Sequence, residues 1–346
     1  MSDLELAGDV RVALSHMAAI GLAALLEDAG MPDVRVRWTG GLESRPIVSG
    51  SGADWAEVAR LVRSHALRHA DASDWTGATI DDGATGLMSP RIKPRGTDAG
   101  WRELTTRRRE VIDMQGEGRR WLDLQMIGAL GEPAHWRFNA QRRRLPDDGA
   151  SRWEMKTRNR GEEFVRHRLH PLARHVAGRS LDDIRDGLVG TRVEDEAGSD
   201  DVAGRTATGL AGPGRTDNAT AWCALWGISQ FGVIQRATRQ SRTVGHLPPV
   251  SRSDPWRRGW FYLPVPTGPI ALPRLRSILV SAQLARAAAL VGADATADTA
   301  LVGEGARAWL LDRAIGAVVH FPIGEYGSAS APERRALLGT VVPLGT

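Results

Sequence analysis

Arginine is the residue type in this sequence whose number and spacing most suggest chemistry. Of 45 basic side chains, only Lys93 and Lys156 are lysines. A guanidinium group carries a planar fork of N–H donors that fits phosphate oxygens and stacks on rings. Codon bias in a GC-rich gene would also replace lysine with arginine. The distribution of arginine along the chain is therefore more informative than its number.

Two segments are rich in basic residues, and an acidic segment separates them. Residues 101–180 carry 18 basic and 11 acidic side chains, and residues 231–280 carry eight basic side chains and one acidic. Residues 181–230 between them carry four basic and nine acidic side chains. This segregation favours a surface for a polyanion, although the sequence does not show that the two segments meet in space.

The first basic segment interleaves arginine clusters with tryptophans. Phosphate binding requires several cations, because each neutralised phosphate releases counterions, and indole rings can stack on unpaired bases. We interpret the segment as a candidate nucleic-acid contact; the alternative is a solvated charged face or a surface for acidic protein partners. The candidates are Arg107, Arg108, Arg109, Arg119, Arg120, Arg142, Arg143, Arg144, Trp153, Lys156, Arg158 and Arg160.

The second basic segment has arginines spaced three apart, which predicts that they lie near one face of a helix. Gly245, Pro248 and Pro249 then predict an extended loop. Such a loop either becomes ordered on a polyanion or has no ligand. The candidates are Arg236, Arg239, Arg242, Arg252, Trp256, Arg257 and Arg258, with Trp153 and Trp256 as stacking or wedge residues.

Motifs for catalysis and metal binding are weak. His65 and His69 share a helix face, but Ala66 stands where the HExxH zinc motif has glutamate. The sequence lacks a Gly-x-Ser-x-Gly or Walker-A motif, and Cys223 lies in an apolar run typical of a buried thiol. We predict no metal, no small-molecule cofactor and no enzymatic activity. The alternative is a metal-independent endoribonuclease that processes guide RNA, in which His167, His170 or His175 acts as acid or base.

The first half of the chain mixes helix and strand patterns. Residues 10–29 are apolar on nearly all sides and predict a buried helix, and alternation predicts a half-buried strand at 34–38. Asp54 and Glu57 predict a capped helix start. The other predicted segments are a short strand at 46–48, a surface loop or inter-lobe connection at 71–100, helical structure at 104–130, strands at 136–138 and 151–157, and a basic helix at 162–177.

The second half begins with an acidic, glycine-rich stretch at 191–217 that predicts a mobile linker. The predicted elements after it are a buried apolar segment at 219–234, a strand at 260–265, helices at 274–290 and 305–314, a strand at 317–322 and a helix at 332–338. Because helices and strands do not alternate regularly, we predict an α+β fold of separated helices with short mixed or antiparallel strands. Residues 1–190 and 218–346 would form two α+β lobes.

Cellular location follows from composition. One cysteine excludes an intramolecular disulfide, and the longest apolar run, at 17–26, is too short to span a membrane. The N-terminus is acidic and lacks the basic region of a secretory signal. We therefore expect a cytoplasmic protein in a reducing environment, with no membrane partner.

Several apolar segments resemble subunits of CRISPR type I surveillance (Cascade-like) complexes, particularly a large subunit of the type I-U, or I-G, group. They are residues 15–26, 34–38, 224–228, 261–265 and 269–276, and the likeness extends over about a third of the chain. The matching positions are framework, so the resemblance assigns no functional residue.

The resemblance implies a non-enzymatic subunit of an RNA-guided complex in antiviral defence. Its partners would be guide RNA, target DNA and other CRISPR-associated subunits, and a separate helicase–nuclease would cut the target. Guide pairing supplies sequence specificity in such systems, while the protein supplies backbone charge and limited groove reading. A structural adaptor whose arginines bind acidic protein partners is the remaining alternative.

Overall fold

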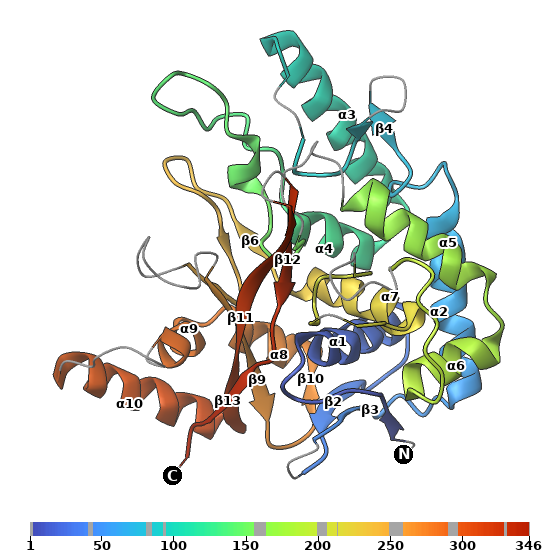
Figure 1. The fold of residues 1–346 in the computed structure, drawn as a ribbon, viewed down its shortest axis with the longest axis vertical. Coiled ribbons are helices and arrows are strands. Elements are labelled where there is room, and N and C mark those ends of the chain that lie inside the picture. Colours follow the sequence, from blue (N-terminus) through green and yellow to red (C-terminus); the bar gives the residue numbers. More distant parts are fainter. Residues whose placement is uncertain are drawn as a thin grey trace.

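Helix α1 (Ala13–Asp28) packs against helix α7 (Asn218–Gly227) near the middle of the molecule (Figure 1). The structure is a computed structural model that describes residues 3–40, 44–80, 85–92, 95–155, 164–198, 206–212, 214–248, 259–289, 297–328 and 331–345. Both helices are apolar on nearly every side, and burial on all sides removes these side chains from water. The predicted buried segments at 10–29 and 219–234 are thereby confirmed, with small shifts of their ends.

The α1 and α7 backbones approach closely because each helix has a glycine at the contact. A methyl group on Gly21 would overlap the carbonyl oxygen of Cys223, and one on Gly227 would overlap the carbonyl oxygen of Met17. The thiol of Cys223 is fully buried here, and burial raises its pKa above the ordinary range. Cys223 is therefore a core residue.

Two antiparallel sheets flank the helices. The first has the order β1 (Leu4–Glu5), β3 (Pro46–Ser49), β2 (Arg35–Trp38) and β10 (Ile270–Ala271). The second has the order β12 (Ala331–Ala336), β11 (Ile315–Ser328), β9 (Trp260–Pro266) and β8 (His246–Leu247), and β13 (Thr340–Pro343) also pairs with β11. Two small hairpins are β4 (Thr79–Ile80) with β5 (Thr85–Gly86), and β6 (Val233–Ile234) with β7 (Arg242–Thr243). This architecture confirms the predicted α+β class.

The remaining helices surround this framework. They are α2 (Trp55–Ala70), α3 (Asp98–Glu117), α4 (Trp121–Leu130), α5 (His170–Gly178), α6 (Leu181–Val189), α8 (Leu272–Leu279), α9 (Ala282–Ala289) and α10 (Ala297–Asp312). Short helical turns occupy Pro146–Gly149, Val165–Leu169 and Ile228–Gln230. The side chain of Asp54 accepts a hydrogen bond from the backbone N–H of Glu57 at 2.8 Å, which confirms the predicted helix start.

Several predicted elements are wrong, and non-local contacts explain why. Residues 332–338 do not form a helix, because most of this segment pairs with β11 as strand β12. Residues 136–138 and the described part of 151–157 form no named strand; Phe138 only bridges to Arg144. The helix expected at 274–290 is divided into α8 and α9. Residues 71–100 are not a surface loop, since Trp75 and residues 87–92 are buried.

The segment expected to be a mobile linker contains tightly packed residues. Of residues 191–217, those at 206–210 are buried, and the backbone N–H of Leu14 donates to the carbonyl of Leu210 at 2.8 Å. Arg179 forms ion pairs with Asp217 at 2.9 Å and Glu196 at 2.6 Å. In the described residues, one hydrophobic core includes side chains from both sides of this segment.

Candidate nucleic-acid interface

Two loops bring the basic segments of the sequence together. The loop between Trp136 and Asp148 lies beside the β6–β7 hairpin at the left of Figure 1. The indole N–H of Trp136 donates to the carbonyl of Arg236 at 3.3 Å, and the N–H of Ser241 donates to the carbonyl of Asp148 at 2.7 Å. These bonds connect positions about 100 residues apart, so the tertiary structure joins what the sequence separates.

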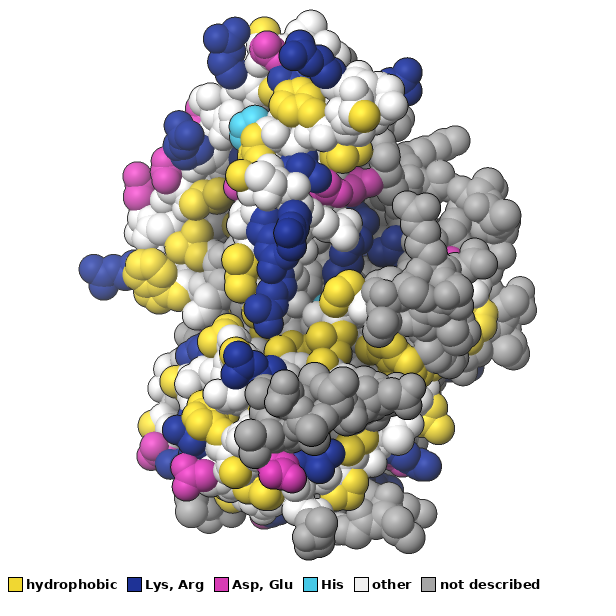
Figure 2. All heavy atoms as spheres, turned by 90° about the vertical axis from the view of Figure 1, so that its left-hand side faces the viewer, with side chains coloured by type: hydrophobic (Ala, Val, Ile, Leu, Met, Phe, Trp, Pro, Cys, Tyr) yellow, Lys and Arg dark blue, Asp and Glu magenta, His cyan; other side chains and the backbone are white. Residues whose placement is uncertain are grey.

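The two loops carry exposed guanidinium groups, four of them outside strands and one, that of Arg242, in strand β7 with a hydrogen bond to the Tyr262 hydroxyl. We define the arginine surface as Arg142, Arg143, Arg236, Arg239 and Arg242, all of which are exposed. Within the described part of the chain, no carboxylate forms an ion pair with any of them. Figure 2, which shows the left-hand side of Figure 1, has a column of Lys and Arg side chains near the middle of this face, with Asp and Glu side chains beside its upper end. The five guanidinium groups therefore carry positive charge that no ion pair within the described residues compensates.

The spacing of Arg236, Arg239 and Arg242 reflects a hairpin and not the predicted helix. Val233 and Ile234 pair with Thr243 and Arg242, and residues 235–241 form the turn between these strands. A hairpin keeps all three arginines on one protrusion, so the correction changes the element but preserves the cluster.

Arg144 has a different role from its neighbours Arg142 and Arg143. Its guanidinium pairs with Asp98, donates to the carbonyl of His135 at 3.1 Å, and lies 5.6 Å from the ring centre of Trp101. The same guanidinium lies 5.2 Å from the ring centre of Phe138. Arg144 therefore fixes the loop onto α3 and does not belong to the exposed charge.

Other arginines that were predicted to contact phosphate form hydrogen bonds or ion pairs within the protein. Arg108 is buried and donates to the carbonyls of Leu87 at 2.8 Å and Gly131 at 3.3 Å. Arg107 donates to the carbonyl of Thr79 at 2.9 Å. Arg120 pairs with Asp74 at 3.0 Å. Arg108 therefore holds the protein together, which corrects its assignment to a phosphate-binding cluster. Arg107 and Arg120 are only partly buried, and their assignment stays a prediction.

Two further candidates do not lie on the arginine surface. Arg119 is exposed, but it follows the C-terminal end of α3. This 20-residue helix is about 30 Å long, and Arg144 pairs with Asp98 at its opposite end. Trp153 is not a stacking residue for a ligand, because it is fully buried and stacks on Phe261 with ring centres 3.8 Å apart. The remaining candidates lie outside the described residues; they are Lys156, Arg158, Arg160, Arg252, Trp256, Arg257 and Arg258.

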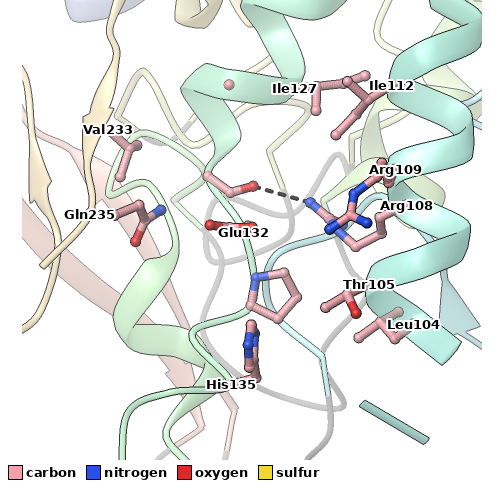
Figure 3. A pocket seen from close by; sticks show the side chains of 13 residues that line it. Leu104, Thr105, Arg108, Arg109, Ile112, Ile127, Glu132, His135, Val233 and Gln235 are labelled. Atoms are coloured by element: carbon pink, nitrogen blue, oxygen red, sulfur yellow. Dashed lines mark hydrogen bonds between the residues drawn. The ribbon is translucent and has the colours of Figure 1, made fainter. Parts of the chain in front are cut away.

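A pocket of about 500 Å³ opens beside the arginine surface, between α3, α4 and the start of the β6–β7 hairpin (Figure 3). Arg109, the exposed member of the 107–109 cluster, lines it from α3, and Gln235 lines it from the hairpin. The other polar side chains that line it are Thr105, Arg108, Glu132 and His135. Sequence reasoning missed Glu132, His135 and Gln235, because only the packing of the two loops against α3 brings them together.

Of the two histidines in α2, both buried, His69 belongs to a polar network, whereas His65 contacts the rings of His69, Trp222 and Trp226. His69 Nδ1 lies 2.9 Å from a carboxylate oxygen of Asp74, and Nε2 lies 3.3 Å from one of Asp123. Burial raises the pKa of Asp74, but hydrogen bonds from His69 and Thr76 outweigh it and lower that pKa. For Asp123 burial prevails and raises the pKa. The described residues contain no His, Cys, Asp and Glu cluster that fits a metal ion.

The three later histidines do not form one site. His170 donates from Nδ1 to the carbonyl of His69 at 3.0 Å, and burial lowers its pKa. His167 and His175 instead line a separate pocket of about 350 Å³ with Arg166 and Glu196. Two of the three residues named for acid–base chemistry therefore share a pocket.

No helix in the described parts of the chain has the length and apolar character needed to span a membrane. Comparison with family models, curated proteins and solved structures finds no match to this chain.

Proposed function

We propose that this protein is a non-enzymatic nucleic-acid-binding subunit that contacts guide RNA or target DNA through the arginine surface. The observation that carries the proposal is the meeting of two sequence-distant basic loops whose exposed guanidinium groups have no carboxylate partner in the described residues. A phosphate backbone supplies the missing negative charges, and counterion release favours its binding.

The sequence resemblance gives the proposal its biological setting, a CRISPR RNA-guided surveillance complex in antiviral defence. The resembling segments form α1, β2, α7, β9 and the β10–α8 region. α1 contacts β2, α7 and α8, and β2 contacts β9 and β10, so the likeness concerns one packed framework. The arginine surface projects from other segments. A framework shared among subunits with variable loops is consistent with this arrangement.

The proposal predicts a salt-dependent affinity that charge reversal abolishes. The test variant is Arg142→Glu with Arg143→Glu, Arg236→Glu and Arg239→Glu; Arg144 is retained because it anchors the loop. For a single strand that makes five phosphate contacts, the slope of log K against log salt is about −3.5, and removing one phosphate contact reduces the magnitude of the slope by about 0.7. Fluorescence anisotropy of labelled RNA and DNA strands at several salt concentrations measures both the affinity and the slope.

A matched control separates local binding from general charge. Arg60 in α2 and Arg174 in α5 are exposed, and Figure 1 shows these two helices at the right, on the other side of the view from the two loops. The double variant Arg60→Glu, Arg174→Glu should bind like the wild type. Equal affinity and salt slope in the four-arginine variant and the wild type would refute the arginine surface. Binding of acidic protein partners without affinity for nucleic acid would favour the structural adaptor.

The pocket that contains His167 and His175 supports a second candidate, a metal-independent endoribonuclease. Two imidazoles in one pocket with Arg166 can supply a general acid, a general base and a cation for phosphate. Incubation with repeat RNA in the presence of a chelator tests it. Defined cleavage that disappears in His167→Ala and His175→Ala would establish this activity, and intact RNA with the wild type would exclude it.

A further inference from the structure

The pocket between α3, α4 and the β6–β7 hairpin is continuous with the arginine surface. Gln235, which lines it, immediately precedes Arg236. His135, also in its lining, accepts the hydrogen bond from Arg144 on its carbonyl and precedes Trp136, which bonds to the Arg236 carbonyl. A strand held on the arginine surface would therefore pass the mouth of the pocket.

The walls suit a flat, partly apolar group. Leu104, Ile112, Ile127 and Val233 supply aliphatic surface, and His135 supplies a ring. Its volume of about 500 Å³ falls in the range of small-molecule sites. Proteins that recognise single strands hold unpaired bases against aromatic rings and guanidinium planes, and the His135 ring and the Arg109 guanidinium are such groups.

Two of the hydrogen-bonding side chains that line the pocket, Gln235 and Glu132, have acceptor oxygens available to a ligand. Gln235 donates one N–H of Nε2 to the carbonyl of Gly149 at 2.8 Å, which leaves its amide oxygen and a second N–H to bond a ligand. Glu132 is exposed, and Figure 3 shows it between Gln235 and the arginines of α3. Its carboxylate interacts electrostatically with the guanidinium of Arg108, but among the described residues no cation lies close enough to form an ion pair with it. The acceptors of Glu132 and Gln235 thus face a ligand that can donate hydrogen bonds.

Building on the proposed function, we propose that this pocket receives a nucleobase flipped out of the bound strand, and that Glu132 makes guanine the preferred base. The Watson–Crick edge of guanine presents two adjacent N–H donors, which one carboxylate can accept together, whereas adenine, cytosine and uracil present one N–H donor position each. Flipped bases are read through hydrogen bonds to this edge and through stacking.

The test uses the full chain and 12-nucleotide uridine or thymidine strands whose central residue is guanine, adenine, cytosine or abasic. We expect the guanine strand to bind roughly 5- to 10-fold more tightly than the others, as for a bidentate base contact. Glu132→Gln should remove this preference and retain the affinity for the uniform strand. RNA and DNA versions of each strand show which backbone the protein prefers.

A variant in which a larger side chain fills the pocket provides the second measurement. Ile112 is 36% exposed, so Ile112→Trp is compatible with folding and should abolish the guanine preference. The matched control is Met114→Trp, which places the same ring at an exposed position of α3 that faces another pocket. An unchanged guanine preference in Ile112→Trp, or no preference in the wild type, would overturn the proposal that the pocket binds a base. The arginine surface would still be supported in that case if binding depended on salt. Failure of the wild type to bind any strand would refute both proposals.

Discussion

At the scale of single residues, arginine has two roles in this protein. Some guanidinium groups satisfy buried backbone carbonyls, as Arg108 does for Leu87 and Gly131. Others, such as Arg142 and Arg143, project from loop tips and are exposed. A buried guanidinium must find acceptors for its N–H groups, because leaving them unpaired costs free energy. Composition alone cannot separate these two roles, and neighbouring arginines in one triplet differ in theirs.

The triplet Arg142–Arg144 allows a direct test of this distinction. We expect Arg144→Ala to lower the free energy of unfolding by about 1–2 kcal/mol, because it removes a carbonyl hydrogen bond and the cation–π contact with Trp101. Arg143→Ala should change it by less than about 0.5 kcal/mol, as is usual for an exposed side chain. Chemical denaturation measures both values. Equal stabilities would mean that Arg144 does not anchor the loop.

At the scale of elements, the contact between α1 and α7 supports the rest of the fold. Both helices are buried over most of their length, and the β2–β3 hairpin and helix α2 contact α1. Gly21 and Gly227 let the backbones come together closely, so the interface has no space for an additional methyl group. Packed interiors resist such insertions because neighbouring backbone cannot move independently.

A pair of glycine variants tests this interface. Gly21→Ala should destabilise the protein by at least about 3 kcal/mol, since its methyl group meets backbone atoms of α7. Gly116 in α3 has open space around it, so Gly116→Ala should stabilise the protein by about 0.5–1 kcal/mol through helix propensity. Urea unfolding midpoints and soluble yields provide the comparison. A wild-type midpoint in Gly21→Ala would contradict the close approach of α1 and α7.

At the scale of the whole molecule, buried histidines couple folding to pH. Burial lowers the pKa of His16 and of His320 to about 4, and it lowers the pKa of His65 well below its ordinary value. The unfolded chain therefore binds protons at a higher pH than the folded chain does. The stability associated with these neutral imidazoles is present above pH 6.5 and is lost as the pH falls towards 4.

His16 provides the cleanest measurement of this coupling. Its Nε2 donates to the carbonyl of Val10 at 2.7 Å, and a glutamine amide can make the same type of bond. Between pH 7 and pH 5, the wild type should lose about 2 kcal/mol more stability than His16→Gln, which has no group that titrates there. Burial raises the pKa of Glu154 to about 7, so this residue also makes the stability depend on pH. Its contribution is the same in both proteins and cancels when their stabilities are subtracted. Parallel pH profiles would show that His16 does not take up a proton on unfolding.

The sequence by itself predicts those helices and strands whose residue patterns depend only on their own segment. An all-round apolar run specified α1, alternation specified β2, and Asp54 with Glu57 specified the start of α2, since each pattern follows from the geometry of its own segment. Segments with weak local patterns were misread. Residues 332–338 are mostly strand only because β11 offers a pairing edge, and residues 87–92 are buried only because other elements cover them.

The candidate site depended still more on tertiary structure. The sequence identified both arginine-rich segments, because charge is a property of each residue alone. Whether a guanidinium group is exposed or bonded internally depends on carbonyls and carboxylates far along the chain, as the contrast between Arg109 and its neighbour Arg108 shows. The meeting of the two loops and the pocket at Glu132 arise from packing between segments about 100 residues apart, and no local pattern encodes such contacts.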